Sequence, residues 1–252
     1  MISEHPVFIS PENKEQVIWR YLDFTKLVSL LESSELFFTR ADKFEDQFEG
    51  SLPKPLVYGR NIWVKNMVEQ GKLSQEYLDF NILSDSTKNA KIEKVINCWH
   101  MNDYESAAMW KLYLKSNEGI AIKSTYSRLY SALSSSEFDI NIGKIKYIDY
   151  ENDIFPLDNG FYPFVHKRKS FEHEQELRAL IWLKSAHNNK LIENIDVLYG
   201  INIEVDLNIL IESIYVSPNS PKWIYDLIVS IIKRYKLNKN VYQSKINESP
   251  IY

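Results

Sequence analysis

Two carboxylates and a guanidinium alternate within the stretch Phe171–Leu183, at Glu174, Glu176 and Arg178. Read as a strand with a period of two, the stretch places these charges on one face, about 7 Å apart along the chain. The other face would carry Gln175, Leu177, Ala179, Ile181 and Leu183. This pattern favours a strand with one buried face and a charged entrance, whose charges could share one small ligand.

The alternative for the same stretch is a helix. Glu174 and Arg178 would then form an i,i+4 surface ion pair worth only a few tenths of a kcal/mol. Short apolar runs fit both structures, so the helix stays open at this point, although we favour the strand.

Composition limits the classes of protein. The chain has 252 residues, a formal net charge of -4 and only seven glycines, with neither a GxGxxG nor a GxxxxGK[ST] motif. The charge argues against general electrostatic capture of nucleic acid, while a local basic patch would still allow it. The single cysteine, Cys98, rules out an internal disulfide and suits a reducing cytoplasm. Without a signal sequence or an 18-residue apolar run, we expect a cytoplasmic protein with no membrane partner.

The order of segments predicts an α+β fold, with a mixed or mostly antiparallel sheet, flanking helices and a helical insertion. We expect residues 1–16 to be a flexible arm and residues 17–252 to form a single domain. Within it, residues 51–90 have the weakest pattern and are expected to be a helical insertion or lid.

Three short segments of the predicted domain would position side chains near the acidic stretch. Val17–Tyr21 is a predicted strand that carries Arg20, Val95–His100 is a second predicted strand, and Ser106–Leu114 is a helix of good helix formers. The rings that these segments bring are Tyr21, His100, Trp110 and Tyr113. Such rings could stack on an adenine or nicotinamide ring, or could simply belong to the core.

Six blocks of the sequence resemble a prokaryotic family catalogued as domain of unknown function 2971. The blocks are Trp19-Arg20-Tyr21, Phe44-Glu45-Asp46-Gln47-Phe48-Glu49, Cys98-Trp99-His100, Ala108-Met109-Trp110-Lys111-Leu112-Tyr113, Glu118-Gly119-Ile120-Ala121-Ile122 and Glu174-Gln175-Glu176-Leu177-Arg178, the last preceded by Lys167 and Phe171. The resemblance spans roughly residues 17–216. Glu45 and Gln47 stand where that family more often has Asn and Pro, and Phe171 where it usually has Trp. The family context suggests a role in bacterial stress or phage defence.

The layout is also similar, more distantly, to that of NAD-dependent ADP-ribosyltransferases. This similarity implies that Arg20 holds a phosphate of NAD, that Glu176 supports the positive charge on the ribose as nicotinamide leaves, and that Glu174 orients an unknown macromolecular acceptor. It implies no metal. The residues expected to bind the nucleotide or dinucleotide are Arg20, Tyr21, His100, Trp110, Tyr113 and Arg178. Cys98-Trp99-His100 departs from the Ser-Thr-Ser of the transferases.

Two other functions remain open from the sequence. In a non-catalytic sensor or interaction module, Arg20 would pair with Glu174 or Glu176, and the charges would fix the fold. In a metal-dependent nuclease, an acidic turn and the later stretch would surround magnesium. The acidic residues that would bind magnesium under this hypothesis are Glu45, Asp46, Glu49 and Glu174.

Overall fold

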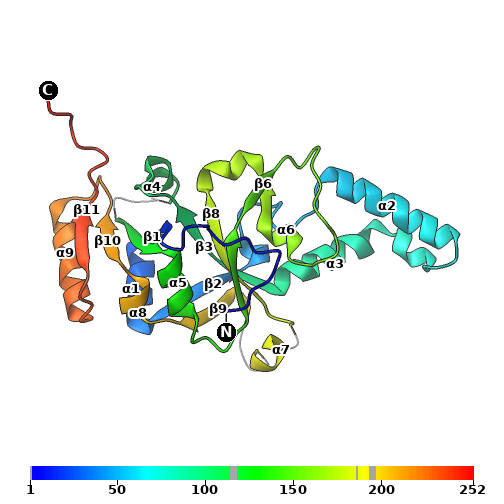
Figure 1. Cartoon of the computed structure of the whole chain (residues 1–252), viewed down its shortest axis with the longest axis horizontal. Helices are drawn as coiled ribbons and strands as arrows, with labels where there is room; N and C mark the ends of the chain where they lie inside the picture. The colour runs from blue at the N-terminus through cyan, green and yellow to red at the C-terminus, as the bar shows by residue number, and fades with distance from the viewer. Residues whose placement is uncertain (1, 114–117, 186, 193–196) are drawn as a thin grey trace.

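The computed structural model describes residues 2–113, 118–185, 187–192 and 197–252, and gives residues 80–83 without their side chains. In this part of the chain, nine strands form one mixed sheet (Figure 1). The strands are β1 (Val17–Asp23), β2 (Glu35–Arg40), β3 (Lys94–Met101), β4 (Gly119–Thr125), β5 (Ile140–Lys144), β8 (Glu176–Trp182), β9 (Gly200–Glu204), β10 (Ser213–Val216) and β11 (Asn240–Gln243). Two further strands, β6 (Lys146–Ile148) and β7 (His166–Arg168), form a separate parallel pair.

The main sheet runs in the order β11-β10-β4-β1-β3-β2-β9, and β8 joins it by pairing with β3 and β5. Only the β10–β11 pair of this sheet is parallel among the described strands. The helices are α1 (Phe24–Ser33), α2 (Lys54–Glu69), α3 (Phe80–Ile92), α4 (Ala107–Tyr113), α5 (Tyr126–Leu133), α6 (Tyr162–Val165), α7 (Asn188–Leu191), α8 (Leu207–Leu210) and α9 (Lys222–Arg234), with 3-10 turns η1 (Ala41–Lys43), η2 (Gln75–Leu78) and η3 (Lys169–Glu174). The predicted α+β fold with a mostly antiparallel sheet is confirmed.

Apolar side chains on both faces of the sheet explain its layers. On one face, α1, α5, α8 and α9 contribute to the largest cluster of buried hydrophobic residues, which includes Ile18 and Leu22 of β1. On the other face, Trp19 and Tyr21 pack with Met109 and Trp110 of α4. Strand β1 thus alternates as its sequence requires, with Trp19 and Tyr21 under α4 and Ile18 and Leu22 in the main core.

Strands β1 and β2 share one edge of β3 but meet it at opposite ends. β1 pairs with β3 at Trp19↔His100 and Ile18↔Met101, whereas β2 pairs with it at Thr39↔Ile96 and Arg40↔Val95. β8 pairs along the other edge of β3 from Lys94 to His100. Between the two short contacts the described strands leave this edge of β3 without a β partner, so the sheet forks between β1 and β3.

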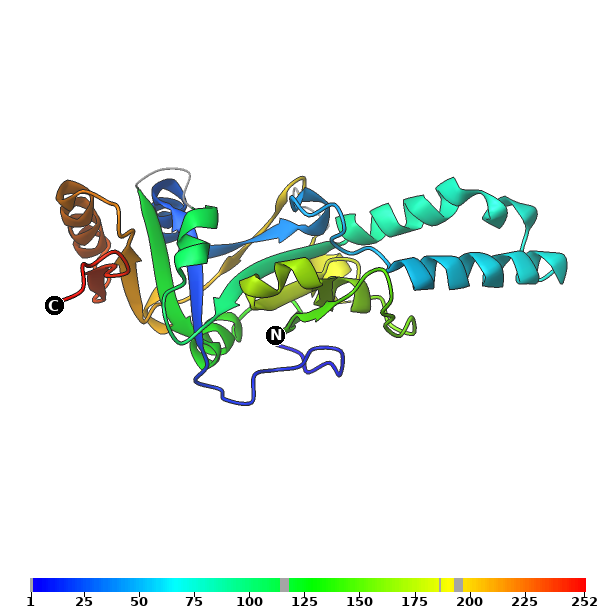
Figure 2. The same cartoon turned by 90° about the horizontal axis from the view of Figure 1, so that it is seen from above.

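The segment that the sequence marked as an insertion is helical. Helices α2 and α3 project from the sheet at the end of the molecule opposite to α9 (Figure 2). Whether they act as a lid stays a prediction. Among the described residues, no helix combines the length and the apolar character that crossing a bilayer requires.

The N-terminal segment lies along β5. The Ser3 amide donates to the Ile140 carbonyl (2.9 Å), the Lys144 amide donates to the Ile9 carbonyl (2.8 Å), and the Phe8 side chain is buried. The described part of residues 1–16 is therefore attached to the sheet, and its expected flexibility stays a prediction. Of the predicted helix Ser106–Leu114, Leu114 lies outside the described residues.

Candidate functional site

A cavity of about 510 Å³ fills the fork between β1 and β3. Its volume lies in the range of small-molecule sites. Side chains from β1, α1, β2, β3 and α4 line it, together with Glu174 at the end of η3 and Glu176 at the start of β8. We call this space the sheet cavity.

Arg20 is a partly exposed cation on the wall of the sheet cavity. One Nη donates to the Cys98 carbonyl (3.3 Å), and the guanidinium lies 5.8 Å from the centre of the Trp99 ring. In the described structure Arg20 forms no ion pair. The alternative in which it pairs with Glu174 or Glu176 is therefore wrong. Burial lowers the pKa of Arg20, but a guanidinium remains charged. Most of its N–H groups remain available to an anion in the cavity.

His100 lines the same cavity and carries an unpartnered ring nitrogen. Its Nδ1 lies 2.6 Å from the Glu174 carbonyl oxygen, and a carbonyl can only accept, so Nδ1 carries the proton. Burial lowers the pKa of His100, which favours the neutral ring. Nε2 is then an acceptor, and it is buried without a hydrogen-bond partner among the described residues. A hydroxyl or N–H of a ligand would satisfy it.

The acidic pair departs from the predicted strand in one respect. Glu174 ends η3, Gln175 takes a left-handed conformation with φ of 39°, and β8 begins only at Glu176. A positive φ at a residue other than glycine costs on the order of 1 kcal/mol. The turn brings both carboxylates to Lys167, which forms ion pairs with Glu174 and with Glu176 (3.4 Å). The strand interpretation of the stretch is confirmed from Glu176 on, and the placement of Glu174 on the strand is wrong.

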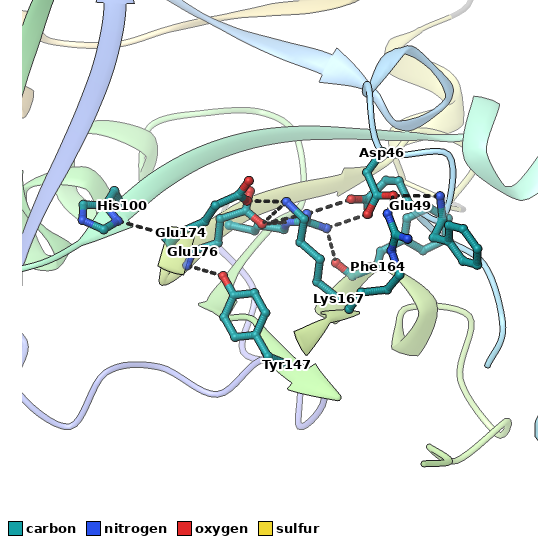
Figure 3. A network of polar contacts seen from close by, with 11 residues as sticks. Asp46, Glu49, His100, Tyr147, Phe164, Lys167, Glu174 and Glu176 are labelled. Atoms are coloured by element: carbon teal, nitrogen blue, oxygen red, sulfur yellow. Dashed lines mark hydrogen bonds and ion pairs between the residues drawn. The ribbon is translucent and has the colours of Figure 1, made fainter. Parts of the chain in front are cut away.

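The predicted single buried face of this strand is also wrong, because both faces of β8 are buried. Arg178 is fully buried, and its donors are all used inside the protein. Figure 3 labels the residues that accept from it, Glu49, Phe164 and Glu176. It donates to both oxygens of Glu49 (2.6 and 2.8 Å), to the Phe164 carbonyl (2.8 Å) and to Glu176 (2.8 and 3.2 Å). Arg178 does not line the sheet cavity, so the structure does not bring it to a bound nucleotide.

The loop before α2 supplies the partner of Arg178. Gly50 follows Glu49 with φ of 65°, and a Cβ at Gly50 would meet the Phe164 ring at 2.5 Å. Only glycine lets the loop approach this closely, which holds the Glu49 carboxylate against Arg178. We call Glu49, Lys167, Glu174, Glu176 and Arg178 the ion network.

The ion network pushes the pKa values of its two site carboxylates apart. Burial opposes ionisation of Glu176, but Arg178, Lys167 and a hydrogen bond from the Cys98 thiol lower its pKa to about 2. For Glu174, burial and the neighbouring Glu176 charge raise the pKa despite Lys167. Two carboxylates with opposite shifts are typical of sites that divide an electrostatic role from a proton-transfer role.

The aromatic residues take two different positions. Tyr21 and Tyr113 line the sheet cavity with ring centres 6.5 Å apart. Trp110 lies behind Tyr21, edge-on at 5.0 Å, and donates to Glu105 (3.0 Å). Trp110 is absent from the cavity wall, so it supports Tyr21 and does not face a ligand.

The structure thus gathers six of the eight predicted site residues around one cavity. They are Arg20, Tyr21, His100, Tyr113, Glu174 and Glu176. Sequence reasoning gave no role to Lys167 in holding the acidic pair, and treated Glu49 as part of a solvated or metal-binding turn. A lysine seven residues before Glu174 has no periodic signal, since a short strand and a 3-10 turn separate the two.

The acids of the nuclease alternative are engaged elsewhere. Asp46 pairs with Arg168 (2.7 Å), Glu49 with Arg178, and Glu174 with Lys167, while Glu45 is exposed. No group of three or more His, Cys, Asp or Glu side chains in the described residues could hold a metal ion. The arrangement therefore does not support the magnesium site.

Comparison with known proteins finds similarity only at the level of solved structures. Thermus sp. 2.9 DarT in complex with NAD+ is similar with a TM-score of 0.42 and 9% identity, over 94% of this chain and 98% of that chain. Thermus sp. 2.9 DarT in complex with ADP-ribosylated ssDNA gives 0.41 and 9%, over 94% and 97%. At these scores the likeness assigns no activity to this chain. No family model matches, and no curated protein matches.

Proposed function

We propose that the sheet cavity binds NAD or a related nucleotide and that the protein cleaves the bond between nicotinamide and ribose, transferring ADP-ribose to an acceptor. The observation that carries this proposal is the convergence of Arg20, His100 with its unpartnered Nε2, and two carboxylates with opposite pKa shifts around one cavity. A guanidinium suits a phosphate, and a neutral imidazole suits a ribose hydroxyl. The rings of Tyr21 and Tyr113 suit a flat base.

The chemistry follows from the two acids. When the bond between the ribose C1′ and the nicotinamide nitrogen breaks, its electron pair leaves with nicotinamide and positive charge grows on the ribose. Glu176, ionised at neutral pH, stabilises that charge electrostatically. The acceptor attacks C1′, and Glu174, whose raised pKa makes it the better base of the pair, takes the acceptor's proton.

A second candidate is a module that binds the nucleotide without turning it over. It is favoured by one observation: Glu176 already interacts with Lys167, Arg178 and Cys98, so much of its charge is neutralised before any ligand arrives. Such a module would use Arg20 and His100 for recognition and the ion network only for the fold.

Nicotinamide release from NAD tests the first candidate. The purified protein is incubated with NAD, alone and with single-stranded DNA, RNA or a protein mixture as acceptor, and nicotinamide is measured by chromatography. We expect release by the wild type and a loss on the order of a hundredfold in Glu176→Gln, because a fixed charge aimed at the transition state is removed. Identical traces for the wild type, Glu176→Gln and buffer would contradict the proposed transfer.

Two controls make the result specific. Glu151→Gln removes an exposed carboxylate that pairs with Lys54 on the surface, and should release nicotinamide like the wild type. Glu174→Gln leaves the Glu176 pairs in place and reports on proton transfer if Glu176→Gln folds poorly. NAD binding that raises the melting temperature without any release would support the second candidate. A role in bacterial stress or phage defence stays a prediction from the resemblance.

A further inference from the structure

Lys94, the first residue of β3, is fully buried outside the sheet cavity. Its Nζ lies 4.2 Å from the centre of the Trp182 ring and 4.9 Å from that of Phe164. Nζ donates to the Ala90 carbonyl (3.2 Å). A buried lysine is normally paired with a carboxylate, yet Lys94 has no ion pair in the described part of the chain.

Burial shifts the protonation equilibrium of Lys94 towards the neutral amine. Burial lowers the pKa of Lys94 to about 8, although the charge of Glu93 opposes this. Glu93 itself pairs with Lys184 (3.0 Å) and accepts from the Trp182 indole (3.2 Å), and it forms no ion pair with Nζ in the described structure. Near pH 8 about half of the Lys94 side chains would therefore be uncharged and nucleophilic.

A second cavity, of about 230 Å³, adjoins this amine. Its wall includes Lys94 and all three groups that surround Nζ, namely Ala90, Phe164 and Trp182. It shares no lining residue with the sheet cavity. One water molecule occupies about 30 Å³ in the liquid, so the volume of this cavity is large enough for a molecule of a few carbon atoms. Residues such as Leu52, Pro163 and Gly160 make the wall largely apolar.

We propose that Lys94 is a covalent capture site for small, uncharged aldehydes. The amine nitrogen attacks the carbonyl carbon to form a carbinolamine, water leaves with the carbonyl oxygen, and a carbon–nitrogen double bond remains between the aldehyde carbon and Nζ. No oxidant or reductant is consumed. Protonation of this imine gives an iminium cation, which keeps a positive charge between the faces of Phe164 and Trp182.

The same charge argument distinguishes aldehydes from carbon dioxide. Carbon dioxide would convert the amine to a carbamate anion and release a proton. That anion would lie against the negative faces of two aromatic rings, and no cationic side chain contacts Nζ in the described structure to pair with it. An aldehyde keeps the sign of charge that this site already accommodates.

Reductive trapping tests the capture. The intact protein is incubated with propionaldehyde and cyanoborohydride between pH 6 and 9, and each lysine is then assigned by peptide mass spectrometry. At pH 7 an exposed lysine of ordinary pKa has on the order of a hundredfold less neutral amine than Lys94. We expect Lys94 to gain one propyl group before exposed Lys184 and Lys222, with labelling that rises until about pH 8 and then levels off.

Controls separate reactivity from accident. Lys94→Met keeps an apolar side chain and should lose this label alone, while protein unfolded in urea should show no preference for Lys94. Should Lys94→Met fail to fold, the ratio of Lys94 to Lys184 labelling in folded and unfolded wild type decides the question. Slower labelling of Lys94 than of exposed lysines at pH 7, or modification by bicarbonate in place of aldehyde, would overturn the proposal.

Discussion

Arg20 and Arg178 are both arginines on strands of one sheet, and their surroundings are opposite. Arg178 is fully buried and donates to two carboxylates and a carbonyl, whereas Arg20 lines the sheet cavity and has a single carbonyl partner in the described structure. Folding completes the hydrogen bonds of Arg178 and leaves those of Arg20 incomplete.

The difference assigns the two cations to different tasks. A buried charge with complete partners costs desolvation and contributes mainly by its arrangement, so its loss damages the fold. A charged group with unused hydrogen-bond donors beside a cavity contributes little to the stability of the fold. It contributes much to the binding of a ligand that accepts from those donors. Glu176 belongs to both settings, because it contacts Arg178 and also lines the sheet cavity.

The largest expected effect is on stability, in Arg178→Met. Removal of this guanidinium leaves Glu49 and Glu176 buried without their main partner, which costs about 3–5 kcal/mol of unfolding free energy. Urea unfolding measures the change. Arg128→Met is the matched control, since Arg128 is partly exposed and donates to the Ile209 carbonyl, and should lose less than about 1 kcal/mol. Equal losses of unfolding free energy in the two variants would contradict the distinction between an arginine whose donors are all used and one whose donors are not.

The next effect is the pH dependence of stability. The folded pKa of Glu176, about 2, lies below the ordinary value of 4.5, so its contribution is present above about pH 4.5 and is lost as pH falls towards 2. The difference corresponds to on the order of 3 kcal/mol. Urea unfolding of Glu176→Gln from pH 2 to 7 should lack this acid-dependent part.

Glu174 has the opposite sign. Its pKa is raised, so the folded state gains relative stability when Glu174 takes up a proton at low pH. Glu174→Gln should therefore steepen the loss of stability in acid, while Glu176→Gln flattens it. If both substitutions change the slope in the same direction, the two carboxylates do not have the opposite surroundings described for them.

A third prediction concerns Arg20→Gln. Loss of a charged hydrogen bond to a phosphate costs about 1.5–3 kcal/mol of binding free energy, or about 10- to 100-fold in NAD affinity. The unfolding free energy should change by less than about 1 kcal/mol, because Arg20 has one hydrogen bond, to the Cys98 carbonyl, and no ion pair in the described structure. Calorimetric titration and urea unfolding of the same sample measure both. Loss of stability on the scale of Arg178→Met, with unchanged affinity, would reverse the comparison.

The sequence predicts those parts of this contrast that depend on local pattern. The strands carrying Arg20 and His100 are recognisable from runs of β-branched and aromatic residues, and they form as β1 and β3. The start of β8 at Glu176, after Glu174, is not recognisable from the sequence, because the left-handed turn at Gln175 accompanies contacts of both acids with Lys167.

Long-range partners decide the rest. Arg178 and Glu49 are 129 positions apart, and no period in the chain relates them. From the sequence, Arg20 and Arg178 are equivalent strand arginines near acidic residues. The pairing of β1 and β2 with opposite ends of β3 leaves Arg20 beside a cavity, whereas Arg178 lies in the core.

The smallest predicted effect tests the unpartnered acceptor of His100. Asn reproduces the Nδ1 donor, so His100→Asn should keep the hydrogen bond to the Glu174 carbonyl and lose only the Nε2 acceptor. We expect about fivefold weaker NAD binding, equivalent to one hydrogen bond of about 1 kcal/mol, with unchanged stability. His100→Gln places its polar atoms near Nε2 and abandons the Glu174 carbonyl, so stability should fall more than affinity. If both variants lose stability alike and neither alters NAD affinity, His100 belongs with Arg178 among the groups that serve the fold.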